Sequence, residues 1–481
     1  MTVDSRLRWL ALYVLCLGDL MIVLDMTIVN VALPSIRDDL GFSQTSLAWV
    51  VNAYLLTFGG FLLLGGRLGD LFGHRRLFLS GIALFTVASL ACGIANSQEF
   101  LVAARAVQGV AGAIVSALAL SMLMILFTEP ADRAKAMGVF GFILSGGGVV
   151  GVLAGGVLTD VLNWHWIFLI NLPVGVLVYV LSLKLLPGGR GIARGRVDVA
   201  GALTITASLM LAVYAIVNGN DKGWAGAETL GVLAVAAALL AIFLVIEARI
   251  LSPLMPLGLF RNLNVSTANV LGVLMAAGMF GYFFFSALYL QLVLRYSPLE
   301  VGLAYLPGTV VWGASSLLLS DRLVMRFGIK PPLLTGLGLM TVALVLLART
   351  PVEGSWALDI LPATLAVGLG AGIAFNPILL AAMSGVAQEQ AGLASGVVNT
   401  AFMMGGAVGL AVLASLADYR TGFLGGVDDL SALNSGYHLA FLVGAVFVVA
   451  SALVGAALLR VEKPQTHSEE TFGRPALGEA E

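Results

Sequence analysis

The residue with the clearest chemical meaning is a carboxylate inside an apolar stretch near the start of the chain. Asp25 lies in LDMTIVNVALP (24–34), where the flanking composition is that of a membrane-spanning helix. A carboxylate deep in such a helix is costly and by default marks a substrate, ion or proton pathway. Asp19, on the same segment and nearer the start, is a second acid. It could share a proton-coupling role, line a cavity, or pair with a neighbouring span.

A guanidinium occupies another apolar segment. Arg105, Gln108, Gly109 and Gly112 follow the i, i+3, i+4, i+7 spacing, so one helix face combines a cation, an amide and two small contacts. The small residues permit close helix approach, and Gln108 can help to solvate Arg105. Arg105 is then either held by a carbonyl or snorkelling, or it is the electrostatic partner of a carboxylate.

The depths of the two charges are compatible with a pair. At about 1.5 Å per residue, Asp25 lies roughly 13 Å from the outer end of its segment and Arg105 roughly 9 Å from the same end of its own. A nearby cation favours an ionised carboxylate, whereas burial favours the protonated form. If Asp25 takes up a proton when it is open to one side of the membrane and releases it when open to the other side, a proton gradient would be coupled to transport.

The amino-acid composition indicates the class of protein in which these charges lie. The 481 residues are 59% hydrophobic and only 11% charged, with a mean hydropathy of +1.00, whereas a soluble domain is about a quarter charged. The chain is therefore expected to be an all-α integral membrane protein. Cys16 and Cys92 fall in apolar segments, which favours packing over a disulfide or a metal site. Nothing indicates nucleic-acid binding or a cleavable signal peptide.

Apolar periodicity predicts fourteen spans joined by mostly short loops. The predicted spans are 8–34, 46–66, 77–96, 99–127, 135–160, 164–186, 199–217, 229–249, 265–294, 299–320, 331–349, 355–381, 391–416 and 436–460. The longest external segment would run from Asp418 to His438. Most Lys and Arg fall on the side of the two termini, which predicts that both termini are cytoplasmic. The other side holds Arg37, Lys222, Arg295, Arg349 and Arg420.

Two sets of residues recur at nearly one spacing, which indicates an internal repeat. Gly138, Gly147, Gly148, Gly151 and Asp160 recur as Gly396, Gly405, Gly406, Gly409 and Asp418; Arg67, Leu68, Phe72 and Gly73 recur as Arg322, Leu323, Phe327 and Gly328. We therefore expect a first six-helix bundle at 1–186, an inserted helix pair with linkers at 187–264, a second six-helix bundle at 265–460, and a disordered cytoplasmic tail at 461–481.

Two further motifs have physical interpretations of their own. In GRLGDLFGHRR (66–76), a tight turn would set a carboxylate against helix ends or guanidinium groups, although positive-inside charge and a glycine turn would explain it equally well. Its candidate residues are Gly66, Asp70, Gly73, Arg75 and Arg76. The segment 141–156 is dense in glycine, which allows close packing and bending of a helix. Its candidate packing residues are Gly147, Gly151, Gly155 and Gly156.

These motifs together resemble those of the major facilitator superfamily, in its fourteen-spanner drug/proton antiporter branch. The resemblance covers the whole transmembrane region and is carried by 66–76, by LVAARAVQGVAGA (101–113) and by 24–34. It implies a gating role for Asp70 and Arg75, and a proton-coupling partnership for Arg105. Leu71 and His74 stand where basic residues are usual in the family's loop, and Val152 stands where the family's antiporter motif has Pro.

The candidate substrate cavity is large and mostly apolar, with few polar anchors, which would suit amphipathic drugs. Single aromatic residues in spans often face lipid instead. The candidate lining residues are Asn30, Trp49, Asn52, Tyr54, Gln108, Tyr282, Phe283, Phe285, Tyr289, Asn376, Asn399 and Met403. Because the second half offers no buried charge to match, proton work is expected in the first half only.

The sequence thus predicts a multi-pass cell-membrane transporter whose partners are small organic substrates, protons and the lipid bilayer. We expect a monomer that exports hydrophobic or cationic drugs in exchange for protons by alternating access, without a cofactor. A symporter, or an exporter of siderophores or lipids, would share the fold. An enzyme is disfavoured because His74, His165, His438 and His467 are scattered, and an ATP-driven pump because a Walker motif is absent.

Overall fold

A computed structural model describes the chain except for residues 1–4, 189–197, 251–252, 385, 387 and 461–481. The described residues form helices and connecting loops, without a strand, and fourteen of the helices are long and apolar enough to cross a membrane. The number of predicted spans is therefore confirmed. The expected disordered tail lies outside the described residues.

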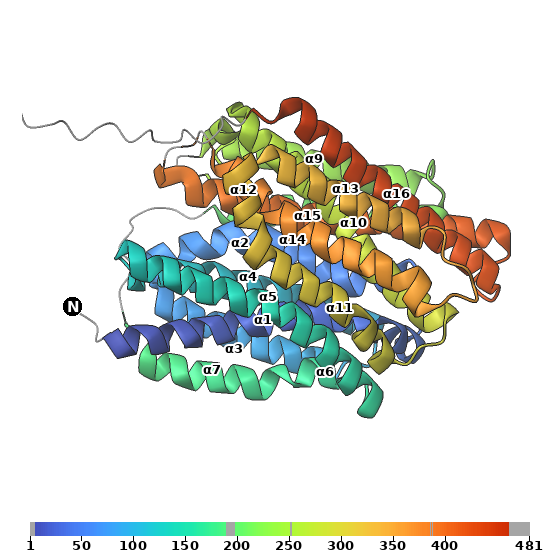
Figure 1. Cartoon of the computed structure of the whole chain (residues 1–481), viewed down its shortest axis with the longest axis horizontal. Coiled ribbons are helices and arrows are strands. Elements are labelled where there is room, and N and C mark those ends of the chain that lie inside the picture. Colours follow the sequence, from blue (N-terminus) through green and yellow to red (C-terminus); the bar gives the residue numbers. More distant parts are fainter. Residues whose placement is uncertain (1–4, 189–197, 251–252, 385, 387, 461–481) are drawn as a thin grey trace, which may run out of the picture.

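The helices follow the chain in an up-and-down order (Figure 1). The first half contains α1 (Ser5–Leu40), α2 (Trp49–Phe72), α3 (His74–Gly93), α4 (Gln98–Leu126), α5 (Pro130–Val161), the short α6 (Trp166–Leu169) and α7 (Asn171–Leu185). Then come α8 (Val199–Lys222) and α9 (Ala227–Arg249). The second half contains α10 (Leu263–Leu288), α11 (Pro298–Ser315), α12 (Asp321–Phe327), α13 (Lys330–Leu347), α14 (Leu361–Met383), α15 (Gln388–Leu424) and α16 (Leu430–Leu458). Short π-helical turns at 289–293, 316–320 and 356–360 extend α10, join α11 to α12, and precede α14.

Several helices are longer than predicted. α1 was expected to end at Pro34 but runs to Leu40, because a proline can remain inside a spanning helix when its surroundings satisfy the freed backbone groups. The predicted external segment 418–438 is also wrong. α15 extends to Leu424, and α16 begins at Leu430 with Asp429 as its N-cap, accepting a hydrogen bond from the backbone N–H of Ser431 at 2.8 Å. Only a short turn remains between them.

The two matched loops have the same backbone feature. Gly73 separates α2 from α3 at φ 95°, and Gly328 separates α12 from α13 at φ 80°. Positive φ is accessible to glycine without a steric penalty. The loop repeat read from the sequence thus corresponds to two equivalent turns.

The matched glycines also pack equivalently. In the first half, Gly147 and Gly151 of α5 face α1, where added β-carbons would meet Val23 and Leu24 respectively. In the second half, Gly405 and Gly409 of α15 face α10, where they would meet Val273 and Ala277. α1 and α10 are therefore equivalent helices, each held against the fifth long helix of its half by small residues.

The halves meet along two seams, α5 with α11 and α2 with α15, and α8 packs beside the second. Figure 1 shows α11 slanting from the second half toward α5. Their close approach lies on the side away from the termini, where a β-carbon on Gly156 would be 2.8 Å from the carbonyl oxygen of Pro298. Toward the termini, Gly138, Gly141, Gly146 and Gly148 have no such neighbour within 4 Å among the described residues.

Candidate functional site

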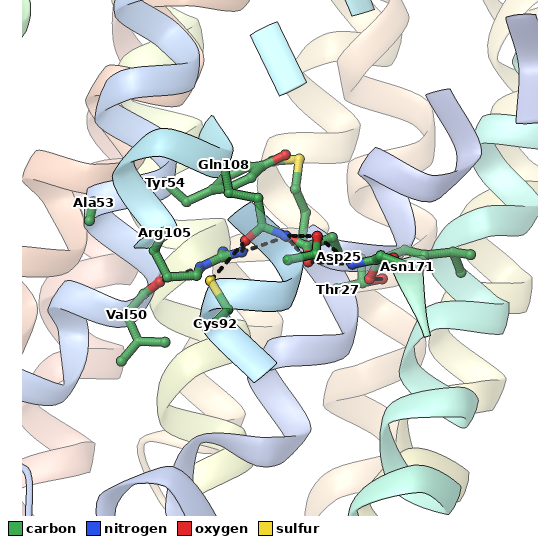
Figure 2. A network of polar contacts seen from close by, with 12 residues as sticks. Asp25, Thr27, Val50, Ala53, Tyr54, Cys92, Arg105, Gln108 and Asn171 are labelled. Atoms are coloured by element: carbon green, nitrogen blue, oxygen red, sulfur yellow. Dashed lines mark hydrogen bonds and ion pairs between the residues drawn. The ribbon is translucent and has the colours of Figure 1, made fainter. Parts of the chain in front are cut away.

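The carboxylate of Asp25 lies at the centre of a buried polar network in the first half (Figure 2). Its Oδ2 accepts a hydrogen bond from Nη1 of Arg105 at 2.5 Å. Its Oδ1 accepts from Nε2 of Gln108 at 2.7 Å and from Nδ2 of Asn171 at 3.0 Å. Asp25 is completely buried. The carboxylate is therefore both ion-paired and hydrogen-bonded, which is what a buried charge requires.

Arg105 is 1% exposed and is held on all sides. Its Nη1 also donates to Oε1 of Gln108 at 2.8 Å, and its Nε donates to the backbone carbonyl of Val50 at 3.0 Å. The guanidinium carbon lies 4.3 Å from the ring centroid of Tyr54, a cation–π distance. The carbonyl contact and the carboxylate contact occur together, so the two interpretations of Arg105 left open by the sequence are not exclusive.

Two members of the network were not singled out from the sequence. Asn171 begins α7, and its Nδ2 also donates to Oγ of Ser89 on α3 at 3.3 Å. Ser89 in turn accepts from Gln108 at 2.8 Å. Cys92, expected only to pack, has its Sγ 3.6 Å from Oε1 of Gln108. A single amide or hydroxyl in an apolar segment carries no spacing signal, so only the fold could reveal these residues.

Glycine packing in α4 makes the network possible. Gly109 lies against the backbone of Tyr54 and the hydroxyl of Thr57 on α2, where a β-carbon would overlap both. A β-carbon on Gly112 would lie 2.9 Å from the hydroxyl of Tyr54. The predicted small face of this helix therefore contacts α2, and this close approach brings Arg105 within reach of the Val50 carbonyl.

Asp19 is separate from this network. It is 4% exposed, and its Oδ1 accepts a hydrogen bond from the hydroxyl of Ser116 on α4. Of the alternatives considered for Asp19, the structure places it in a pairing with a neighbouring span. Its contribution to proton coupling stays a prediction.

The loop predicted to gate lies at the termini side of the first half. Asp70, half exposed, is 3.3 Å from Nε2 of His74, and Nη2 of Arg75 donates to the carbonyl of Leu183 at the end of α7. Gly73 forms the turn, whereas Gly66 has no neighbour within 4 Å of a β-carbon, and the side chain of Arg76 has no described partner. The described polar contacts of this loop thus stay within the first half, whereas Leu68 packs in an apolar cluster with Ala202 and Leu254 of the inserted segment.

The candidate aromatic residues fall into two groups. Phe283 is half-buried and stacks on Trp312 of α11 with ring centroids 6.3 Å apart, while buried Tyr282 packs edge-on against Tyr305. Phe285 and Tyr289 lie elsewhere. Phe285 packs against Tyr437 and Phe441 of α16, and the hydroxyl of Tyr289 donates to the carbonyl of Pro351. These last two residues belong to the core of the second half, which argues against a cavity-lining role.

The partly exposed candidates lie near a wider aromatic wall. Phe402 of α15 packs against Phe375 and Phe280, with centroids 5.4 and 6.1 Å away. The candidates Asn376, Asn399 and Met403 flank this wall on α14 and α15 and are half-buried. Neither amide hydrogen-bonds to a described residue. The aromatic residues 280, 312, 375 and 402 were missed because isolated aromatic side chains in apolar spans usually contact lipid.

The remaining candidates lie in the first half. Trp49 is half-buried, and Asn30 donates to the carbonyl of Met26 within α1 at 3.2 Å. Asn52 and Tyr54 are buried on α2, with neither polar atom of Asn52 satisfied by a described residue. Tyr54 serves the Arg105 network. Within the described part of the chain, no group of three His, Cys, Asp or Glu residues could hold a metal ion.

Comparison with known proteins agrees with this architecture. The family model of the Major Facilitator Superfamily matches residues 15–410. The chain belongs to the major facilitator superfamily. Its fourteen apolar helices and its relatives make it a membrane transporter and not an enzyme.

Two curated relatives are similar over nearly their full length. The puromycin resistance protein pur8 of Streptomyces alboniger is 39% identical over 461 residues, covering 93% of this chain and 90% of that protein. The cephamycin export protein CmcT of Amycolatopsis lactamdurans is 36% identical over 447 residues, covering 92% and 91%. Among solved structures, the nucleoside transporter NupG superposes with a TM-score of 0.68 at 11% identity, covering 94% of this chain and all of that one. The last similarity concerns the fold alone.

Proposed function

We propose that this transporter exports hydrophobic or cationic organic compounds, such as antibiotics, in exchange for protons. The direction of transport is supported by relatives named for puromycin resistance and cephamycin export. The exchange for protons rests on one observation, the fully buried Asp25–Arg105 pair. Charges buried in a membrane are energetically costly, so an intramembrane ion pair by default marks a functional site.

The geometry around Asp25 corresponds to the ionised carboxylate. Both oxygens accept hydrogen bonds from donors that carry their own protons, namely Arg105, Gln108 and Asn171. Proton uptake would cancel the negative charge, weaken the attraction to Arg105, and leave the guanidinium bound to the Val50 carbonyl and Gln108. Protonation would thus loosen α1 from α4, which is how the charge state could bias the conformation.

The contacts between the halves support alternating access with the present state closed on one side. The halves are joined away from the termini at Gly156 and Pro298, and by Nε2 of Gln291 donating to the Val31 carbonyl at 2.8 Å. If both termini are cytoplasmic, as charge asymmetry predicts, this closed side is external. The state would then be inward-facing in a bacterial inner membrane, with the bundles 1–186 and 265–460 as the moving units.

The substrate would contact the wall of Phe280, Phe283, Trp312, Phe375 and Phe402, with the free amides of Asn376 and Asn399 as its polar anchors. Such a wall provides large apolar and aromatic surfaces but few fixed hydrogen bonds. That chemistry favours broad binding of flat or amphipathic compounds, including organic cations by cation–π contact.

The test is proton movement in proteoliposomes on addition of a cationic dye under an imposed pH gradient, comparing the native chain with Asp25→Asn. Dye-evoked proton release should occur in the native protein and vanish in the variant. Asp38→Asn is the matched control, because Asp38 is on the same helix with its side chain 65% exposed. Release should remain unchanged in that control.

Other outcomes have distinct meanings. Proton release that survives in Asp25→Asn would contradict the assigned carrier and direct attention to Asp19. Proton movement in the same direction as the dye would indicate symport. Absence of dye-evoked proton movement in the native chain, with dye transport intact, would overturn proton coupling itself.

A further inference from the structure

A second buried acidic site lies outside the Asp25 network, in the inserted helix pair. Asp198 is the N-cap of α8, and Glu247 stands in the last turn of α9. They are 2% and 3% exposed, respectively. Together with Asp19, Asp25 and Arg105, they are the buried charged residues in the described part of the chain.

The two carboxyl groups lie against the same glycine. A β-carbon on Gly201 would lie 3.0 Å from Oε1 of Glu247 and would overlap Oδ2 of Asp198, so both oxygens lie on the same side of that glycine. Oδ2 of Asp198 and Oε1 of Glu247 therefore border the same small space beside this glycine. These same two oxygens have no donor from any described residue, and no described ion pair neutralises either group.

The other oxygen of each group is already occupied. Oδ1 of Asp198 accepts a hydrogen bond from the backbone N–H of Gly201 at 2.8 Å, and Oε2 of Glu247 accepts from the backbone N–H of Met255 at 3.0 Å. The two unsatisfied oxygens therefore lie beside Gly201 together, each without a described donor. Two buried carboxylates in contact cannot both be ionised at modest cost, and a single proton between them would satisfy both.

We propose that Asp198 and Glu247 share one proton and form a second proton-binding site of this transporter. The proton resides on Oε1 of Glu247 and is donated to Oδ2 of Asp198. Helix dipoles favour this assignment, because a negative charge is stabilised at the N-terminus of α8 and destabilised at the C-terminus of α9. In this state every oxygen of the pair has one hydrogen-bond partner.

The site also anchors a turn at the seam between the halves. Glu247 binds the backbone of Met255, and the neighbouring Leu254 packs with Leu64 of α2. Met255 itself packs in an apolar cluster that includes Leu63 of α2 and Val397 of α15. Loss of the shared proton would place two negative charges in contact and weaken this turn on the termini side of the α2–α15 seam.

The test is infrared spectroscopy of the full chain in lipid nanodiscs at neutral pH, with and without ¹³C-carboxyl glutamate. A protonated glutamic acid gives a carboxylic-acid C=O band that moves when glutamate is labelled. Among glutamates whose side chains the structure describes, only Glu247 is buried. The native chain should therefore show one labelled-glutamate band, without the need for any mutation.

Variants assign the band. Glu247→Gln should remove it and still fold, because the amide can donate to Asp198 and accept from Met255. Asp198→Asn should shift the band, because the acceptor changes from a carboxylate to an amide. Glu228→Gln, an exposed residue of α9 paired with Lys222, is the matched control and should leave the band unchanged.

Three results would overturn the proposal. Absence of a glutamic-acid band in the native chain would mean that Glu247 is ionised, either because the proton resides on Asp198 or because both carboxylates are ionised, and would overturn the assignment of the proton to Glu247. Persistence of the band in Glu247→Gln would place the proton on another glutamate. A band lost in Glu247→Gln but unmoved in Asp198→Asn would show that Glu247 holds its proton alone. None of these results depends on whether the chain exchanges drugs for protons.

Discussion

The two halves of the molecule use equivalent helices for different chemistry. α1 carries Asp25 in a network with Arg105, whereas the equivalent α10 carries Tyr282 and Phe283 and has no buried charge in the described chain. The same glycine packing holds both helices in place. One backbone arrangement can therefore hold a charge pair on one side and an aromatic wall on the other, and the side chains alone decide which.

The difference also explains why the first half needs more polar partners. A buried ion pair is stable only when its remaining hydrogen-bonding capacity is satisfied. Five helices contribute to this in the first half, through Asp25, Val50, Ser89, Gln108 and Asn171. An aromatic wall makes no such demand, since it requires only packing. Substitutions in the polar network of the first half and in the aromatic wall of the second half can test this contrast.

The largest effect is expected from Arg105→Ala, which leaves Asp25 buried without its cation. Breaking a buried pair from one side costs about 3–5 kcal/mol of unfolding free energy. Chemical denaturation in detergent measures it. Arg37→Ala is the control, because the exposed pair with Asp38 should contribute only about 0–1 kcal/mol.

The double variant Asp25→Leu, Arg105→Leu should recover much of the lost unfolding free energy while remaining unable to couple protons. A double variant as unstable as Arg105→Ala would contradict the conclusion that the unpaired Asp25 carboxylate causes the loss.

A smaller effect is expected from Gly156→Leu at the α5–α11 seam. The new side chain would collide with the Pro298 backbone, and overpacking of this kind costs about 1–3 kcal/mol. This collision destabilises the conformation in which α5 and α11 are in contact. Spin labels at Asp160→Cys and Glu300→Cys, both exposed positions, should show a population at longer distance.

The control for the seam is Gly141→Leu, on the same helix. Its β-carbon has no described neighbour within 4 Å, so the distance distribution should not change. An identical shift in both variants would mean that bulk anywhere on α5 disturbs the helix, and the seam would then have no special role.

Phe283→Ala should weaken binding of an aromatic cationic dye about tenfold, or about 1.4 kcal/mol, because it removes the surface stacked on Trp312. Equilibrium dye binding measures this, and the number of protons released per dye transported should not change. Phe285→Ala provides the contrast: it should destabilise the fold without a specific change in dye affinity, since this ring is buried against α16. Unchanged affinity in Phe283→Ala would remove this residue from the wall.

The smallest effect is expected from Asn171→Ala. It removes one of the two amide donors to Oδ1 of Asp25 while Gln108 remains, so a loss of about 1 kcal/mol of unfolding free energy is expected. Asn376→Ala in the second half should cost less, because that amide has no hydrogen bond to a described residue. Equal losses of unfolding free energy in the two variants would show that the hydrogen bond of Asn171 to Asp25 does not stabilise the first half.

The sequence predicted the fold more fully than the site. The spans, the repeat and the charge pair Asp25–Arg105 were accessible because each leaves a strong signal: long apolar runs, recurring glycines, and charges where lipid is expected. The ends of α1 and α15 were misplaced because a proline or a polar residue does not by itself end a spanning helix. Asp198 and Glu247 were overlooked because they stand near helix ends, where charges are usually exposed.

The sequence by itself determined that the chain crosses a membrane many times, and it indicated that Asp25 and Arg105 could pair at similar depth, since the cost of an unpaired charge in lipid favours such a pair. Only the tertiary structure decided which neutral groups complete the network, that Phe285 and Tyr289 belong to a core, and that two carboxyl groups of the inserted pair lie against the same glycine. These outcomes depend on how helices distant in sequence are rotated and packed, and composition and spacing do not encode those rotations residue by residue.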